Sequence, residues 1–200
     1  MKKENVLIIF IKNPEPGKVK TRLGASIGEI KAYRIYKKLL EHTRNISLST
    51  ELHRQLWYSS FVDHTDEWNP KQFEKHLQKG KDLGERMKNA FEHVFNEGYK
   101  HVVIIGSDCP ELTPDILEEA FETLKVCDIV IGPSEDGGYY LLGMNQFISG
   151  FFTDINWSTN TVFDETIQTA AELDLHYRTL PVLNDIDSAD DLIKSDLSDE

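Results

Sequence analysis

A carboxylate, Asp108, stands at the kind of position where α/β enzymes most often carry out their chemistry. It lies in the turn Gly106–Pro110, directly after the apolar run Val102–Ile105. An apolar run bounded by Gly and Pro is typical of a buried strand of a parallel sheet, and ligands bind just beyond the carboxyl ends of such strands. Carboxylate oxygen is a hard ligand that suits Mg²⁺ or Mn²⁺. Asp108 is therefore a candidate metal ligand, although Asp is also a common turn residue.

A basic loop follows the first apolar run of the chain, Asn5–Ile11. Residues 12–22 hold four cations and one acid in an otherwise acidic chain. Pro14 and Pro16 stiffen this loop, and Gly17 lets the backbone approach a ligand closely. Neither G-x-x-x-x-G-K-[ST] nor G-x-G-x-x-G is present. Because arginine binds phosphate bidentately and lysine acts as a point charge, we predict a nucleotide-phosphate site; a solvated basic loop is the alternative. The four cations are Lys12, Lys18, Lys20 and Arg22.

A glycine-rich loop follows another apolar run, Asp128–Gly132, and reaches the same predicted edge of the sheet. Gly137 and Gly138 permit backbone angles or ligand contacts that other residues do not. Asp136 is a candidate for binding the acceptor or for acting as general base. Asp-Gly is also a strong turn signal, so an ordinary β-turn is the alternative interpretation.

Near the end of the chain, Asp185 and Asp187 alternate, so in an extended segment their side chains share one face. From there Asp187 is a candidate second metal ligand opposite Asp108. Helix capping by Asp187 and Ser188 is the alternative, and it leaves Asp185 unexplained.

Arg86 is unusually placed for a cation. Asp82–Glu85 is a capping-box pattern that opens a predicted helix, so Arg86 falls in its first turn. A cation there opposes the helix dipole, which suggests that Arg86 has a polar partner or a ligand.

Predicted strands and helices alternate along the chain without a break in composition. Apolar runs predict strands at 5–11, 53–60, 101–106, 128–132, 139–144 and 175–180, and helical periodicity predicts helices at 28–46, 82–98, 113–124, 160–173 and 188–194. Residues 12–27 are predicted to be a loop, and 61–81 to be irregular with a short helix at 70–78. The pattern predicts one α/β domain, residues 1–195, with a mainly parallel central sheet flanked by helices, and then an acidic tail, residues 196–200.

Composition excludes several classes of protein. The net charge of −12 argues against general nucleic-acid binding. No apolar run approaches 18 residues, so we expect no membrane span, and the run at 5–11 is too short for a signal peptide core. The two cysteines, Cys109 and Cys127, with no export signal favour a reducing cytoplasm. The seven His residues are scattered, which disfavours a zinc site.

Taken together, the motifs resemble those of one bacterial family, the uncharacterised glycosyltransferase-like proteins called DUF2064. Members are also described as transferases associated with radical-SAM/selenodomain or arsenosugar gene clusters. The resemblance covers about residues 5–193. It is carried, in order, by Pro14-x-Pro16-Gly17-Lys18-x-Lys20-Thr21-Arg22-Leu23, Asp82-Leu83-Gly84-Glu85-Arg86-Met87, Gly106-Ser107-Asp108-Cys109-Pro110, Gly132-Pro133-x-x-Asp136-Gly137-Gly138-Tyr139-Tyr140-Leu141-Leu142-Gly143 and Asp185-Ile186-Asp187.

The resemblance implies a GT-A-like fold of the nucleotide-diphospho-sugar transferase superfamily, which also contains nucleotidyltransferases. It implies that Lys18, Lys20 and Arg22 bind phosphate. It also implies that Asp108 binds the metal, and Asp187 is similar to the second metal ligand that some of these nucleotidyltransferases use before their last helix. Glycosyltransferases of this fold commonly carry Asp-x-Asp, whereas the single Asp108 is closer to the nucleotidyltransferase pattern.

We therefore expect a transferase that depends on Mg²⁺ or Mn²⁺ and uses a nucleotide-activated donor, with a nucleotide-diphospho-sugar as donor and a small molecule as acceptor. The alternative enzyme is a guanylyltransferase-like nucleotidyltransferase that uses an NTP and releases pyrophosphate. A non-catalytic nucleotide-binding module is a third reading. Either enzyme requires that Asp108, Asp187 and the loop Lys18–Arg22 converge on one cleft. The base, the sugar, the acceptor and the oligomeric state stay open.

Overall fold

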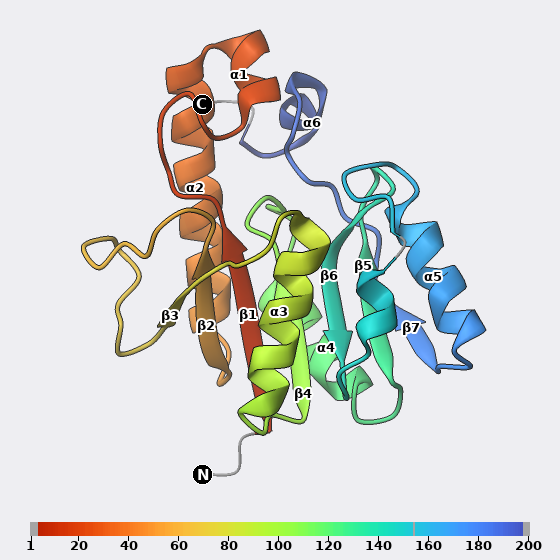
Figure 1. The fold of residues 1–200 in the computed structure, drawn as a ribbon. Helices are drawn as coiled ribbons and strands as arrows, with labels where there is room; N and C mark the ends of the chain where they lie inside the picture. The colour runs from red at the N-terminus through yellow and green to blue at the C-terminus, as the bar shows by residue number, and fades with distance from the viewer. Residues whose placement is uncertain (1–3, 154, 198–200) are drawn as a thin grey trace.

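A computed structural model describes residues 4–153 and 155–197, and its strands form one seven-stranded sheet in the order β3-β2-β1-β4-β6-β5-β7 (Figure 1). The strands are β1 (Asn5–Ile11), β2 (His53–Tyr58), β3 (Glu74–Leu77), β4 (His101–Ile105), β5 (Ile129–Pro133), β6 (Tyr139–Met144) and β7 (Tyr177–Thr179). The helices are α1 (Thr21–Ile27), α2 (Glu29–Leu48), α3 (Leu83–Asn96), α4 (Pro114–Thr123), α5 (Val162–Glu172) and α6 (Ala189–Lys194), with a 3₁₀ turn, η1 (Ser149–Phe152).

Strand β6 runs antiparallel to both of its neighbours, β4 and β5, while the other strand pairs are parallel. An antiparallel pair needs only a tight connection, and β5 and β6 are joined by the short loop that carries Asp136. The other strands enter the sheet through longer crossovers. The predicted α/β fold with a mainly parallel, helix-flanked sheet is confirmed.

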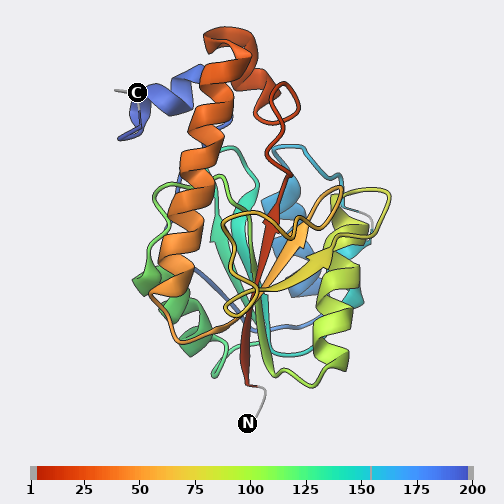
Figure 2. The ribbon, with the colours of Figure 1, turned by 90° about the vertical axis from the view of Figure 1, so that its left-hand side faces the viewer.

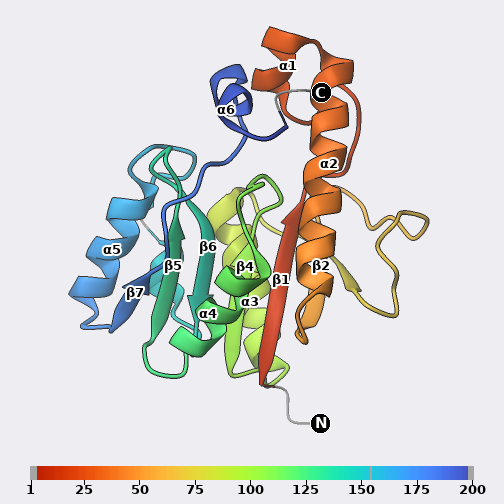
Figure 3. The ribbon, with the colours of Figure 1, turned by 180° about the vertical axis from the view of Figure 1, so that it is seen from behind.

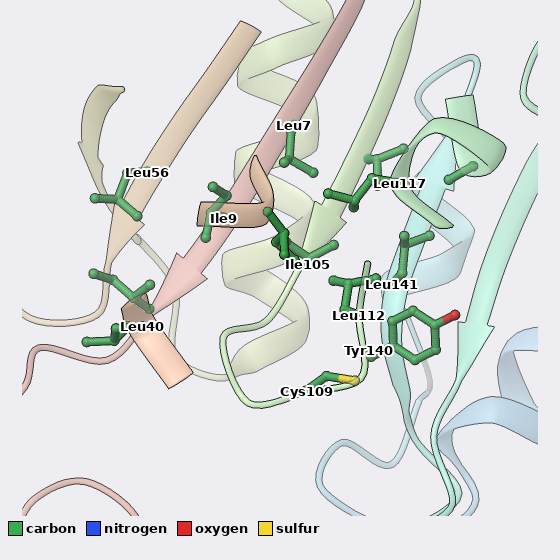
Figure 4. Close-up of a cluster of buried hydrophobic side chains, with 14 of the residues drawn as sticks. Leu7, Ile9, Leu40, Leu56, Ile105, Cys109, Leu112, Leu117, Tyr140 and Leu141 are labelled. Carbon is green, nitrogen blue, oxygen red and sulfur yellow. The ribbon is translucent and has the colours of Figure 1, made fainter. Parts of the chain in front are cut away.

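Strand β1 lies inside the sheet and is buried on both faces, which explains its unbroken apolar run. Leu7 and Ile9 belong to a cluster that α2 and α4 cover, and Figure 4 shows Leu7 and Ile9 among its members. Val6 and Ile8 belong to a second cluster on the opposite face, which α3 and α5 cover. Figures 1 and 3 show these helix pairs on opposite sides of the sheet. The helices thus leave the carboxyl ends of the strands available for a site.

A third apolar cluster joins the two ends of the chain. Leu23 of α1 and Leu39 of α2 pack with Ile186 and with Leu192 of α6. Figure 2 shows α6 beside α1 and the upper end of α2. The backbone N–H of Ile186 donates to the carbonyl of Asp108 at 3.0 Å. This packing holds the segment around Asp187 above the end of β4.

Two local predictions are wrong. Residues 21–27 form α1 instead of a loop, and 74–77 form the strand β3 instead of part of a short helix. Helix α1 buries only Leu23, so it shows no repeating apolar stripe. Strand β3 lies at the sheet edge with no fully buried residue, so it shows no alternation. Of the predicted acidic tail, residues 196–200, the last three lie outside the described residues.

Candidate functional site

A cleft of about 890 Å³ opens at the carboxyl ends of β1, β2 and β4 and extends over the loop between β5 and β6. Its volume falls in the range of small-molecule sites, roughly 300–1,000 Å³. The cleft therefore lies at the edge of the sheet where Asp108 and the basic loop were expected.

Lys20 provides a buried positive charge in this cleft. Its side chain is only 4% exposed, and its Nζ lies 3.1 Å from Asp108 Oδ1 and 3.3 Å from Asp187 Oδ1. Burial alone would lower the pKa of Lys20, but the carboxylates of Asp108 and Asp187 outweigh it and raise the pKa above its usual value. Lys20 therefore stays charged and holds two acids from distant segments together.

The backbone at Lys20 is strained. It caps the N-terminus of α1 with φ 48° and ψ 45°, in the left-handed region. A non-glycine residue there costs roughly 1–2 kcal/mol, and such strain clusters at functional sites. The bend turns Lys20 into the cleft, whereas Lys18 is 71% exposed and pairs with Glu15.

The ends of β1 and β4 are tied together behind Asp108 by Tyr36 of α2. The Tyr36 hydroxyl accepts from the Lys12 N–H and donates to the Lys12 carbonyl, both at 2.9 Å, and lies 3.3 Å from Ser107 Oγ. Burial of Tyr36, with the nearby carboxylate of Asp108, raises the pKa of this hydroxyl far above its usual value. Tyr36 thus stays neutral and fixes both strand ends.

Asp185 is a half-buried carboxylate that capping does not explain. Its burial, together with the nearby carboxylate of Asp108, raises the pKa of Asp185 to about 7. The carboxyl groups of Asp108 and Asp187 are more exposed, at 39% and 53%. The alternation of Asp185 and Asp187 in the sequence was the signal for this group.

This raised pKa gives a prediction for stability in metal-free buffer. An ordinary Asp titrates near 4, so the folded protein binds more protons than the unfolded chain between about pH 4 and 7. The free energy of unfolding should then fall as pH rises through that window. Asp185→Asn removes the charge that causes this fall, so the free energy of unfolding at pH 8 should rise by about 1–2 kcal/mol relative to the wild type. This figure allows for the partial solvent access of the Asp185 side chain. Urea unfolding at pH 5 and pH 8 measures it.

The matched control is Asp190→Asn, which changes an exposed carboxylate of α6. It should leave the pH dependence of the wild type unchanged. A free energy of unfolding with the same pH slope in Asp185→Asn and in the wild type would contradict the prediction.

The loop between β5 and β6 forms one wall of the cleft. Asp136 Oδ1 accepts from Ser134 Oγ at 2.6 Å and from the Gly138 N–H at 2.9 Å, which is the turn expected from the Asp-Gly pair. Gly137 has φ 87°, and a Cβ there would lie 2.1 Å from the Asn160 carbonyl oxygen. The loop is therefore packed closely against residues 157–163.

The start of α3 also lines the cleft. Asp82 caps the helix by accepting from the Glu85 N–H at 2.8 Å, while Glu85 Oε2 accepts from the Lys81 N–H. Arg86 Nε donates to the Gly80 carbonyl at 3.2 Å, and its remaining nitrogens have no partner among the described residues. They are free to bind a ligand in the cleft.

Two further residues of the lining had little sequence signal. Gln78 follows β3, and its Nε2 donates to the carbonyls of Ile11 and Trp57 at 3.2 and 2.8 Å. Because the sequence did not predict strand β3, it gave no indication that Gln78 would lie at the end of a strand and line the cleft. Trp157 lies so close to α3 that a Cβ on Gly84 would be 2.0 Å from its Nε1.

The structure brings most, but not all, of the predicted site residues together. Those that line the cleft are Lys12, Lys20, Arg22, Arg86, Asp108, Asp136, Gly138 and Asp187. Those that do not are Pro16, Gly17, Lys18 and Gly137. The expected convergence therefore holds for the second half of the basic loop, since Arg22 Nη1 also lies 3.5 Å from Asp187 Oδ2.

The donor set fits a hard divalent cation. Across residues 4–153 and 155–197, no three or more His, Cys, Asp or Glu side chains are grouped to hold a metal ion. Mg²⁺, however, is usually held by one or two carboxylates, with water and substrate phosphates completing the shell. Asp108 and Asp187 offer such oxygens and already share a cation, the Lys20 ammonium.

The sequence comparisons show the family. Residues 43–159 match DUF2064, described as an uncharacterised protein family conserved in bacteria. This chain belongs to the DUF2064 family. No curated protein matches the sequence. In the described part of this DUF2064 chain, no helix is long and apolar enough to cross a membrane.

A solved structure resembles this DUF2064 protein over nearly its whole length. It comes from Desulfovibrio desulfuricans G20 and is described as a candidate nucleotide-diphospho-sugar transferase. The two chains are 34% identical with a TM-score of 0.87, over 95% of this chain and 85% of that chain. The predicted family and superfamily resemblance is thereby confirmed.

More distant structures share the fold alone. Rv0371c of Mycobacterium tuberculosis H37Rv, solved with manganese, has a TM-score of 0.57 and 13% identity over 97% of this chain and 98% of that chain. A CMP:2-keto-3-deoxy-manno-octonic acid synthetase solved with CTP has a TM-score of 0.57 and 9% identity over 96% of each chain.

Proposed function

We propose that this protein is a transferase that depends on Mg²⁺ or Mn²⁺ and uses a nucleotide-activated donor, with transfer of a glycosyl group from a nucleotide-diphospho-sugar to a small acceptor as its reaction. The observation that carries the proposal is the meeting of Lys20, Asp108 and Asp187 in one cleft. These residues come from three distant segments, so turn formation or helix capping does not account for their meeting.

In such a reaction the cationic residues and the carboxylates have different roles. Arg22 and Lys20 stabilise the negative charge of the diphosphate as it leaves the donor. Asp108 and Asp187 hold the divalent cation, which supplies further charge stabilisation on the phosphate oxygens when it is bound. The similarity to a candidate nucleotide-diphospho-sugar transferase supports this donor class.

Asp136 and Arg86 also line the cleft. One carboxylate oxygen of Asp136 holds its turn, and the other is available to orient an acceptor hydroxyl or to accept its proton. Arg86 offers unpaired guanidinium nitrogens for the donor nucleotide.

Nucleotidyl transfer from an NTP is a second candidate, favoured by one observation. Asp108 has no neighbouring acid in the sequence, and the second carboxylate on Lys20, that of Asp187, comes from the segment before α6. This arrangement is similar to the nucleotidyltransferase pattern. The distant likeness to a CTP-bound synthetase is compatible with it.

A ligand panel followed by product analysis tests the proposal. Thermal shift is measured with nucleoside diphosphates, triphosphates and sugar nucleotides, with and without Mn²⁺, because a ligand that binds the folded state raises Tm. We expect metal-dependent stabilisation by a sugar nucleotide and release of a nucleoside diphosphate on turnover. Release of pyrophosphate from an NTP would establish the second candidate. Binding without turnover would indicate a nucleotide-binding module, and no shift with any nucleotide would refute both enzymes.

A further inference from the structure

The ammonium group of Lys20 contacts both of the carboxylates that are proposed to hold a divalent cation. It contacts one oxygen of each candidate ligand, Asp108 Oδ1 at 3.1 Å and Asp187 Oδ1 at 3.3 Å. A Mg²⁺ ion requires its carboxylate oxygens at about 2.0–2.1 Å. A metal ion that binds these two oxygens would lie close to the ammonium and compete with it for the same negative charge.

We infer that Lys20 is a built-in competitor of the metal: it occupies the carboxylate pair in the free protein and is released to the donor phosphates when the metal binds. The inference rests on the proposed function and adds a regulation of the same site. It gives Lys20 two alternative partners, the Asp108–Asp187 pair and the diphosphate.

The surroundings of Lys20 support two such positions. Its side chain is buried at 4% exposure, whereas the two carboxylates are 39% and 53% exposed. The metal can therefore approach the carboxylates from solvent while Lys20 holds them from within.

This exchange makes metal binding and phosphate binding cooperative. In the free protein the metal must displace Lys20, so its affinity is reduced. A diphosphate that accepts the released ammonium removes this penalty, and by reciprocity the metal strengthens phosphate binding. The free protein is then protected from binding divalent cations that no donor accompanies.

The first test titrates Mn²⁺ alone, followed by electron paramagnetic resonance, into the wild type, Lys20→Met and Lys18→Met. Lys20→Met keeps the length of the side chain without its charge, and it should bind Mn²⁺ about tenfold more tightly than the wild type. Lys18→Met, in the same loop but paired with Glu15 outside the cleft, should bind as the wild type does.

Equal or weaker Mn²⁺ binding by Lys20→Met would overturn the competition and leave the metal site intact. Absence of Mn²⁺ binding in every variant would overturn both the competition and the metal dependence of the proposed function.

A second test needs no variant, so it does not depend on Lys20→Met folding. Lysine acetylation of the wild type is quantified by mass spectrometry with and without Mn²⁺. Mn²⁺ should raise the labelling of Lys20 several-fold and leave that of Lys18 unchanged. Labelling of Lys20 that stays constant or falls when Mn²⁺ is bound would contradict its release.

Discussion

Asp108→Asn is expected to abolish metal-dependent nucleotide binding, with a loss of affinity of at least about 100-fold. Changing groups that only orient a metal ligand typically costs 10–100-fold, and Asp108 is proposed to be a ligand itself. The amide keeps the shape of the side chain but loses its charge, so both Lys20 and the metal lose a partner. Thermal shift with Mn²⁺ and the nucleotide that stabilises the wild type best measures the effect.

The control for this substitution is Asp115→Asn, which removes an exposed carboxylate of α4 outside the cleft. It should bind metal and nucleotide as the wild type does. If Asp108→Asn bound the Mn²⁺–nucleotide pair with unchanged affinity, the metal would have to be held elsewhere and the proposed chemistry would fail.

Gly137→Ala is expected to lower the free energy of unfolding by about 2–5 kcal/mol. Its positive φ of 87° costs a residue with a Cβ roughly 1–2 kcal/mol. The new Cβ would also lie 2.1 Å from the Asn160 carbonyl, and such overpacking adds typically 1–3 kcal/mol. Because the obstacle is backbone, the loop must move away from residues 157–163, so nucleotide binding should weaken as well. Chemical denaturation and the thermal-shift assay measure both.

Gly98→Ala separates the two costs. Gly98 has a similar φ of 92°, but a Cβ there meets nothing within 4 Å. It should show only the backbone cost and leave ligand binding unchanged. Equal destabilisation by the two substitutions would show that the close approach to Asn160 contributes nothing.

The sequence predicted the position of those cleft residues that follow buried strands. Asp108 and Asp136 come after apolar runs bounded by glycine, and the carboxyl ends of such strands meet at one edge. Asp187 was predicted by its alternation with Asp185. In each case the pattern of burial was local, so it could be read without the structure.

Which of Lys18 and Lys20 lines the cleft could not be predicted from the sequence. Lys18 and Lys20 are both lysines of the same basic loop, and nothing in the sequence distinguishes their roles. Of the two, only Lys20 lines the cleft. The difference arises from the positive φ of Lys20 at the start of α1, a helix with a single buried residue. Such a bend is held by tertiary packing between α1, α2 and α6, which no short window of sequence contains.

The contact between Lys20 and Asp187 spans 167 positions along the chain. A chain emerging from the ribosome presents its N-terminal part first, so β1, β2 and β4 have pairing partners long before Asp187 exists. The carboxylate pair is completed only when the segment that carries Asp187 docks on α1 and α2. A chain that lacks this segment would then have most of the sheet but not the carboxylate pair, so docking of the segment determines when the candidate site forms.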